Sequence, residues 1–271
     1  MKTIVIFSGA GLSKESGIPT FRDLNGLWHQ MKVEDVADQE GWKRNPQLVL
    51  DFYAERFANI KSCEPNAGHK AIAKLEEKYN VLNVTQNIDD LLERAGCTNV
   101  WHLHGSIGRR KCEKHKGISN LDGDTVFTCD HGETHDEPVK MGDKCVKCGG
   151  QMRPDVVWFG EAVDMRGDYL DKLAETTDVF IGVGTSAQVS PAAGLLFTFR
   201  SAKKKYFVDP NPPLRLQSYT RITGTATEQL PKLVDELIAC ENPGLACGLS
   251  PEAIKAFKMA KEQRKEQAKV D

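Results

Sequence analysis

The stretch TIVIFSGAGLS, residues 3–13, decides the fold. Its first five residues, Thr3 to Phe7, are an apolar run typical of a strand buried on both faces of a parallel sheet. A glycine-rich turn follows at once, as in the first strand of a doubly wound sheet. Gly9 and Gly11 let the backbone turn tightly and approach a phosphate, and the amides that open a following helix favour an anion. The stretch predicts an α/β fold.

Further apolar runs alternate with helical patterns along the chain. The runs are NVLNVTQN (80–87), NVWHLHG (99–105), DVFIGVGTS (178–186) and KKYFVDPN (204–211). The helical patterns are residues 45–61, 69–79, 167–177 and 227–239. Because strands and helices alternate, we expect a parallel, Rossmann-like sheet. We expect the Rossmann-like part of the chain, the sheet with its helices, to comprise about residues 1–28, 78–106 and 154–240.

Two segments interrupt this alternation. Residues 23–66 contain only helical pattern and loops, and residues 107–153 are polar and rich in Gly, Cys and His. We expect them to form one smaller module, helical over about 29–70 and metal-binding over 107–153. Residues 1–240 are then one catalytic domain, and residues 241–271 are a charged, helical extension.

The composition narrows the class of partner. The chain has 271 residues, of which 40% are hydrophobic and 27% charged, and a formal net charge of −2. This charge argues against nucleic acid or an anionic membrane as the main ligand. No apolar run approaches the roughly 20 residues that span a bilayer. We expect a cytoplasmic enzyme with a small or local ligand.

The first glycine loop belongs to a longer string, GAGLSKESGIPTFRD, residues 9–23. Gly-x-Gly alone is equally an ordinary strand-to-helix turn, and the third glycine comes too late for the dehydrogenase fingerprint. The whole string, however, resembles the nucleotide loop of sirtuins, the NAD-dependent protein deacylases. Four later stretches resemble other motifs of that family in the expected order: TQNIDDLLERAG (85–96), HLHGS (102–106), RPDVVWFGE (153–161) and GTSAQVSPAAGL (184–195). The resemblance covers roughly residues 1–238.

The resemblance implies a reaction between NAD and an acylated lysine of a protein. The acyl oxygen attacks a ribose carbon, nicotinamide leaves, and a histidine then takes a proton from a ribose hydroxyl. The products are free lysine, nicotinamide and 2'-O-acyl-ADP-ribose. Histidine suits this role because its ordinary pKa, about 6.5, is close to neutral pH.

His104 is the candidate base, since it lies where an apolar strand ends in Gly105, at the ligand-facing edge of a parallel sheet. His102, on the same face of the strand, is the competing candidate or a hydrogen-bonded core residue. The resemblance adds Asn87 to the catalytic residues, although Asn87 and Asp89 could instead cap a helix. It assigns a larger set to the cofactor: Gly9, Ala10, Gly11, Ser13, Phe21, Arg22, Gln86, Asn87, Asp89, Gly184, Thr185, Ser186, Asp209 and Ala226.

The sequence departs from the family pattern at three positions near this site. Asp90 stands where glycine is usual, Leu92 where histidine is usual, and Asp209 where an asparagine near the adenine ribose is usual. Asp90 and Leu92 are not reacting groups, so we expect altered packing near the site and no loss of activity. The Asp209 carboxylate can accept hydrogen bonds from ribose hydroxyls as well as an asparagine can.

An arginine lies on an apolar helical face in DFYAERFANI, residues 51–60. At about 100° per residue, Arg56 falls within the face that Tyr53 and Phe57 share. A buried guanidinium needs an anion. Tyr-x-x-Arg resembles the acyl pocket of sirtuins that prefer acidic acyl groups, which implies a substrate carboxylate. An internal ion pair with Asp35 or Glu34 is the alternative.

The resemblance also places the substrate peptide. It assigns Val157, Phe159 and Gly160 to one side of the peptide and Val189 to the other, and it favours a monomer. NAD hydrolysis or mono-ADP-ribosyl transfer at the same NAD site is the alternative activity. A non-catalytic NAD-binding or zinc-mediated interaction module is a third hypothesis.

Four of the eight cysteines indicate a structural zinc site. Cys145-x-x-Cys148 has the spacing of a zinc knuckle, and Cys112 begins the opposing one. The fourth ligand is Cys129 or His115, and we favour Cys129 because sirtuin zinc sites are normally all-cysteine. Four protein ligands leave no open position for water, so the metal would be structural.

Overall fold

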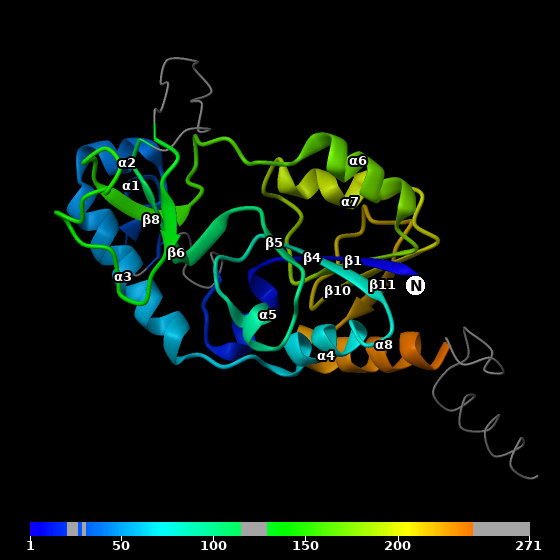
Figure 1. Ribbon diagram of the computed structural model, residues 1–271. Helices are drawn as coiled ribbons and strands as arrows, with labels where there is room; N and C mark the ends of the chain where they lie inside the picture. The colour runs from blue at the N-terminus through cyan, green and yellow to red at the C-terminus, as the bar shows by residue number, and fades with distance from the viewer. Residues whose placement is uncertain (21–26, 29–30, 115–128, 241–271) are drawn as a thin grey trace, which may run out of the picture.

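A six-stranded parallel sheet organises the chain (Figure 1), in a computed structural model that describes residues 1–20, 27–28, 31–114 and 129–240. The strand order is β11-β10-β9-β1-β4-β5. The strands are β1 (Thr3–Ser8), β4 (Asn80–Thr85), β5 (Val100–His102), β9 (Val179–Val183), β10 (Lys204–Asp209) and β11 (Thr220–Thr223). The predicted fold class and its first five strands are confirmed. Strand β11 was not predicted, because it is an edge strand whose residues are all exposed or half-buried and so carries no apolar run.

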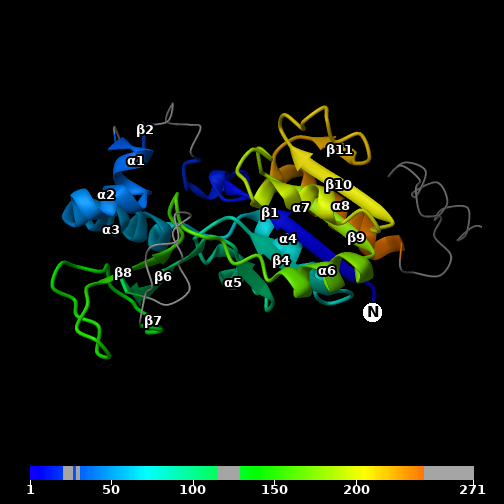
Figure 2. The ribbon, with the colours of Figure 1, turned by 90° about the horizontal axis from the view of Figure 1, so that it is seen from above.

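Helices cover both faces of this sheet (Figures 1 and 2). Ile4 and Ile6 of β1 pack with α4 (Ala67–Leu75) and α8 (Ala226–Cys240) on one face. Val5 and Phe7 point to the other face, toward α6 (Gly167–Thr176) and α7 (Leu195–Thr198). Successive residues of a strand face opposite sides, which is why a continuous apolar run predicted this double burial.

A smaller antiparallel unit lies beside the sheet in both views (Figures 1 and 2). Its three strands follow the order β7-β6-β8. Its elements are β6 (Gly105–Cys112), β7 (Gly132–Thr134), β8 (Met152–Val156), α1 (Val33–Val36), α2 (Gln39–Arg44) and α3 (Pro46–Ser62). The expectation that residues 23–66 contain only helices and loops was wrong, because β2 (Leu27–Trp28) and β3 (Met31–Lys32) pair as antiparallel strands. Each strand has two residues, which is too short to show the alternating pattern of a strand.

Helix α3 matches the helical pattern of residues 45–61. The Asn45 side chain accepts a hydrogen bond from the Leu48 N–H (3.1 Å), and Pro46 opens the first turn, so local sequence fixes this start. The apolar face of α3 packs on Ile107 of β6 and Val156 of β8. This packing joins the two interrupting segments into one unit.

Strand β8 belongs to the smaller sheet, although we placed the return to the main sheet at about residue 154. The next strand of the main sheet is β9. The predicted extension, residues 241–271, lies outside the described residues. None of the described helices combines the length and apolar content needed to cross a bilayer.

A buried ion pair closes the loop that follows β8. Arg153 Nη2 lies 2.5 Å from Glu161 Oε1, and the two side chains are 2% and 3% exposed. The guanidinium also stacks on the Trp158 ring, with Cζ 3.7 Å from the ring centroid. Glu161 Oε2 accepts the backbone N–H of Trp158 (3.0 Å). The Glu161 carboxylate therefore contacts both Arg153 of β8 and Trp158 in the loop that follows it.

We expect Arg153→Met to lower the free energy of unfolding by about 3–5 kcal/mol, because it leaves the Glu161 carboxylate buried without its cation. The matched control is Arg109→Met, since Arg109 pairs with Asp155 while half exposed, and such pairs contribute about 1 kcal/mol or less. Urea unfolding of the two variants measures the difference. Equal losses would contradict the central role of the buried pair.

Candidate active site

The site residues gather at the carboxyl edge of β1, β4, β5 and β9. Strand β1 pairs with β4 on one side and β9 on the other. The chain thus changes direction of winding at β1, and ligands of doubly wound sheets bind at such a switch point. The loops that follow these four strands carry most of the predicted residues.

The glycine loop packs directly against the loop after β9. The Gly11 N–H donates to the Gly184 carbonyl (2.8 Å), and the Gly9 N–H donates to the Val183 carbonyl (3.1 Å). Ala10 lies in a short 3₁₀ turn, Ala10–Leu12. Across the same edge, Gln86 Nε2 donates to Thr185 Oγ1 (2.9 Å). The structure thus brings these predicted residues together at the carboxyl edge of the sheet.

A buried polar network connects Asn87 to the glycine loop. Asn87 Nδ2 donates to the Gly9 carbonyl (3.2 Å) and to Ser13 Oγ (3.1 Å). His69 Nε2 lies 3.4 Å from Ser13 Oγ, while its Nδ1 accepts the Asn66 N–H (3.3 Å). The ring proton therefore belongs on Nε2, and His69 donates to Ser13. Burial lowers the pKa of His69 to about 4, so the ring is neutral.

His69 was not among the predicted site residues. The available signal was PNAGH, residues 65–69, in which Asn66 precedes His69 by the three residues of a capping box. That pattern marks the start of α4. It gives no indication that the ring reaches Ser13.

Asp89 is buried beside this network, at 5% exposure. Burial raises the pKa of its carboxyl group, and a hydrogen bond with Ser13 opposes that rise. Asp89 Oδ1 also accepts the Leu91 N–H (3.2 Å) just before α5 (Leu91–Arg94). The N-cap residue of α5 is Asp90, whose side chain makes no capping bond, so Asp89 is not the N-cap and only accepts the N–H of the first helical residue.

His104 has one ring nitrogen engaged and one available. Its Nδ1 lies 3.0 Å from the Gln86 carbonyl oxygen, which can only accept, so Nδ1 carries the proton. Nε2 then carries the lone pair. Burial lowers the pKa of His104, which favours the neutral, basic form. This is the state that a general base requires.

His102 is engaged at both nitrogens. Nδ1 lies 2.8 Å from the Asn87 carbonyl oxygen and Nε2 lies 2.8 Å from Glu93 Oε1. Burial alone would lower the pKa of His102, but the bond to Glu93 outweighs it and raises that pKa. Two acceptors favour the protonated ring, so His102 fits a structural role better than that of a base.

The remaining cofactor candidates are divided between the edge and its surroundings. Ser186 is half-buried beside Thr185, and Asp209 Oδ1 accepts the Asn211 N–H (2.8 Å) at the end of β10. Ala226 is buried at the start of α8. Phe21 and Arg22 lie outside the described residues.

The predicted acyl pocket lies on α3. Tyr53 and Arg56 are 3% and 5% exposed, and Arg56 Cζ lies 4.9 Å from the Phe52 ring centroid. Burial lowers the pKa of Arg56, but a guanidinium remains charged at neutral pH. Asp35, the alternative partner, forms an exposed ion pair with Arg44 at 2.9 Å.

The predicted peptide segment follows β8. The Val157 N–H donates to the His104 carbonyl (2.9 Å), and the Phe159 N–H donates to the Ala37 carbonyl (2.9 Å). Gly160 has a φ of +83°, which reverses the chain before Glu161. Phe159 and Val189 are 50% and 39% exposed. These exposed apolar side chains are available to a peptide.

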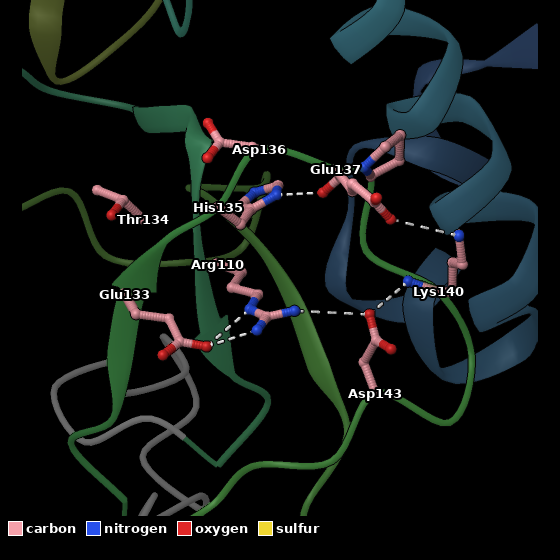
Figure 3. A pocket seen from close by; sticks show the side chains of 9 residues that line it. Arg110, Glu133, Thr134, His135, Asp136, Glu137, Lys140 and Asp143 are labelled. Atoms are coloured by element: carbon pink, nitrogen blue, oxygen red, sulfur yellow. Dashed lines mark hydrogen bonds and ion pairs between the residues drawn. The ribbon is translucent and has the colours of Figure 1, made fainter.

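A separate hollow of about 390 Å³ lies on the smaller unit and shares no residue with the site (Figure 3). Several of its charged groups are paired with one another. Arg110 contacts Glu133 (2.7 Å) and Asp143 (3.7 Å), and Lys140 contacts Glu137 (3.7 Å). Its lining carries four acidic and two cationic side chains, so the hollow has an excess of negative charge.

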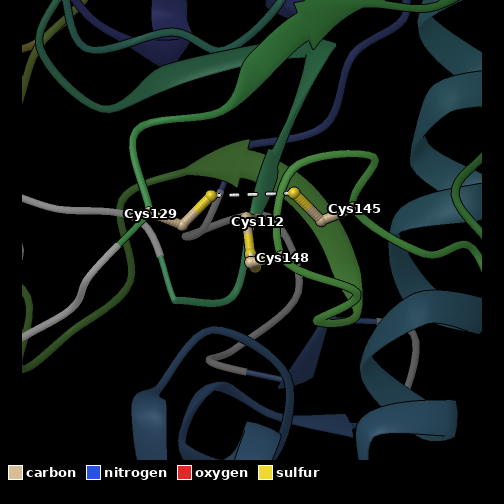
Figure 4. A group of neighbouring side chains, drawn as sticks. All are labelled: Cys112, Cys129, Cys145 and Cys148. Atoms are coloured by element: carbon tan, nitrogen blue, oxygen red, sulfur yellow. Dashed lines mark hydrogen bonds between the residues drawn. The ribbon is translucent and has the colours of Figure 1, made fainter.

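Four cysteines lie close together near Cys112, the last residue of β6 (Figure 4). The sulfur atoms of Cys112, Cys129, Cys145 and Cys148 all lie within 4.8 Å of one another. Two of the sulfur pairs are 3.4 and 3.6 Å apart. Tetrahedral zinc, with Zn–S bonds of about 2.3 Å, holds its sulfurs about 3.8 Å apart, so this cluster could hold zinc with little adjustment. His115 lies outside the described residues.

The chain is similar to known proteins over most of its length. The Sir2 family model matches residues 9–191. An NAD-dependent protein deacylase of Bacteroides thetaiotaomicron is 43% identical over 212 residues, 78% of this chain and 87% of that protein. One of Helicobacter pylori is 40% identical over 241 residues, 87% of this chain and 99% of that protein.

Solved structures agree with this fold. A Sir2 homologue in complex with NAD is 34% identical with a TM-score of 0.76, over 88% of this chain and 90% of that one. A mutant Sir2 homologue in complex with 2'-O-acetyl ADP ribose is 33% identical with a TM-score of 0.77, over 90% and 95%. Since family model, relatives and fold agree over most of its length, the chain belongs to the Sir2 family of NAD-dependent protein deacylases.

Proposed function

We propose that this sirtuin removes acidic acyl groups (succinyl, malonyl or glutaryl) from lysine side chains of proteins in preference to acetyl. NAD is the co-substrate, and the products are nicotinamide, free lysine and 2'-O-acyl-ADP-ribose. The observation that carries the acyl preference is the burial of Tyr53 and Arg56 on one face of α3.

The residues at the sheet edge fit NAD. A side-chain carbon on Gly9 would lie 2.9 Å from the Gly184 carbonyl oxygen, so glycine at this position is what lets the loops after β1 and β9 pack together at the edge. Gln86, Asn87 and Asp89 present amide and carboxylate groups to the same edge. Such groups bind hydroxyls and carboxamides. When bound, NAD would supply a ribose carbon activated by its cationic leaving group.

His104 moves the proton in this proposal. Its Nδ1–H is held by the Gln86 carbonyl, which fixes the tautomer and aims Nε2 as the acceptor. The Val157 N–H bonds to the backbone carbonyl of the same residue. The base is therefore anchored to the segment that we assign to the peptide, so peptide and proton acceptor are aligned together.

The segment after β8 favours deacylation over the alternative activities. NAD hydrolysis has no need for a peptide site, whereas Val157 to Glu161 is held in place by hydrogen bonds to His104, Ala37 and Arg153. The solved relative bound to 2'-O-acetyl ADP ribose carries a ligand of the kind expected as product. A buried base also argues against a non-catalytic binding module.

The charge of Arg56 supports the acyl preference. A guanidinium can hold a carboxylate with two parallel hydrogen bonds, and a phenol can add a third. Burial raises the pKa of Tyr53, which keeps its hydroxyl protonated as a donor. An acetyl group offers no carboxylate to either side chain. The pocket should therefore discriminate by charge.

We expect Arg56→Met to lower the ratio of kcat/KM for succinyl-lysine over acetyl-lysine peptides by roughly 10- to 150-fold. This corresponds to a charged hydrogen bond of about 1.5–3 kcal/mol. Arg44→Met is the matched control, because Arg44 is an exposed arginine of the same unit. Equal losses on both peptides, or an equal effect of the control, would contradict the assignment.

We expect His104→Tyr to reduce formation of acyl-ADP-ribose by about 10²- to 10⁴-fold, the usual contribution of a general base. Because burial lowers the pKa of His104 and the basic form is needed, native kcat/KM should rise with pH and level off, its acid limb lying below 6.5. Mass spectrometry of products and a pH profile measure both. Free ADP-ribose as the main native product, or a limb above pH 7, would overturn the scheme.

We also propose that Cys112, Cys129, Cys145 and Cys148 hold a structural zinc. Cys145→Ala should lose the metal and unfold the smaller unit, whereas Cys97→Ala, which changes a buried cysteine outside the cluster, should retain both. Metal analysis and circular dichroism measure this. His115→Ala should keep the zinc and Cys129→Ala should lose it; the reverse would identify His115 as the fourth ligand.

A further inference from the structure

The indole of Trp158 is bonded to the tyrosine of the acyl pocket. Its Nε1 lies 3.1 Å from the Tyr53 hydroxyl oxygen, and the ring centroids are 6.4 Å apart. Both side chains are 3% exposed. Neither composition nor spacing pointed to this contact, because the two residues are 105 positions apart.

The direction of this hydrogen bond determines where the phenol proton points. An indole N–H only donates, so the Tyr53 oxygen is the acceptor. The hydroxyl proton must then lie away from Trp158. Within the described part of the chain, this hydroxyl donates to no acceptor. Tyr53 therefore retains one donor that is oriented and not used by the fold.

Trp158 cannot easily turn away from Tyr53. Its backbone N–H is bonded to Glu161, and the guanidinium of Arg153 stacks on its ring. Trp42 packs at a centroid distance of 5.4 Å and an interplanar angle of 36°. Since the Arg153–Glu161 pair is itself buried, the indole is fixed by the same contacts that fix the peptide segment.

We propose that Trp158 is a positioning residue for acyl selection, whose N–H directs the Tyr53 proton toward the acyl carboxylate that Arg56 holds. This inference rests on the proposed acyl preference and deepens it. An undirected hydroxyl can point its proton or its lone pairs at the carboxylate, and lone pairs repel an anion. A directed one presents only the proton.

The test is a double-mutant cycle on the succinyl-to-acetyl ratio of kcat/KM. Trp158→Phe should lower the ratio by roughly 2- to 12-fold, as expected for one hydrogen bond. In a Tyr53→Phe background, the same substitution should change the ratio by less than about twofold, because the hydroxyl that it orients is gone. Trp42→Phe keeps an aromatic ring packed on the Trp158 indole and removes no hydrogen bond to Tyr53, so it should change the ratio by less than about twofold.

A shape-preserving substitution separates orientation from packing. Trp158→3-benzothienylalanine replaces the N–H by sulfur and keeps the bicyclic ring, so it should fold as the native chain does and lower the ratio as Trp158→Phe does. A native-like ratio with this analogue, or equal effects of Trp158→Phe in both backgrounds, would overturn the inference alone. A native enzyme without preference for succinyl over acetyl would overturn the proposed acyl selection and this inference together.

Discussion

The close contact between Gly11 and Gly184 is the constraint on which the site depends. A side-chain carbon on Gly11 would lie 2.7 Å from the Gly184 Cα, and one on Gly184 would lie 2.4 Å from the Leu12 nitrogen. Gly184 also has a φ of +59°, which disfavours other residues. Glycine at both positions lets the loops that follow β1 and β9 meet this closely. The loops that carry Ser13 and Thr185 are placed by this contact.

The polar groups next to this contact are buried, and so each must have a partner. Ser13 Oγ meets this requirement for Asn87 and for His69. The arrangement leaves the His104 lone pair on Nε2 as the basic group beside the edge. The same hydrogen bonds therefore satisfy these buried polar groups and hold the residues of the candidate site in place. This is why the polar residues cluster at the strand ends.

Residues 157–161 join the parts of the proposed mechanism. Val157 is bonded to the backbone of His104, Trp158 to Tyr53, and Glu161 to Arg153. The proposed base, the proposed acyl pocket and the proposed peptide face therefore belong to one connected structure, even though they come from both the parallel sheet and the smaller unit. A substitution in this short segment should therefore affect the base, the acyl pocket and the peptide face.

The sequence by itself determined the elements whose signal is local: the buried strand at Thr3–Ser8, helix α3 with Arg56 on its apolar face, and the Cys145–Cys148 knuckle. Periodicity and spacing record which side of an element is buried. Tertiary structure alone decided the contacts of His69 with Ser13 and of Trp158 with Tyr53, across 56 and 105 positions. It also decided the edge strand β11 and the meeting of Cys129 with the other cysteines. The physical reason is that a pattern shows that a group is buried, while its partner is fixed only when distant segments pack together.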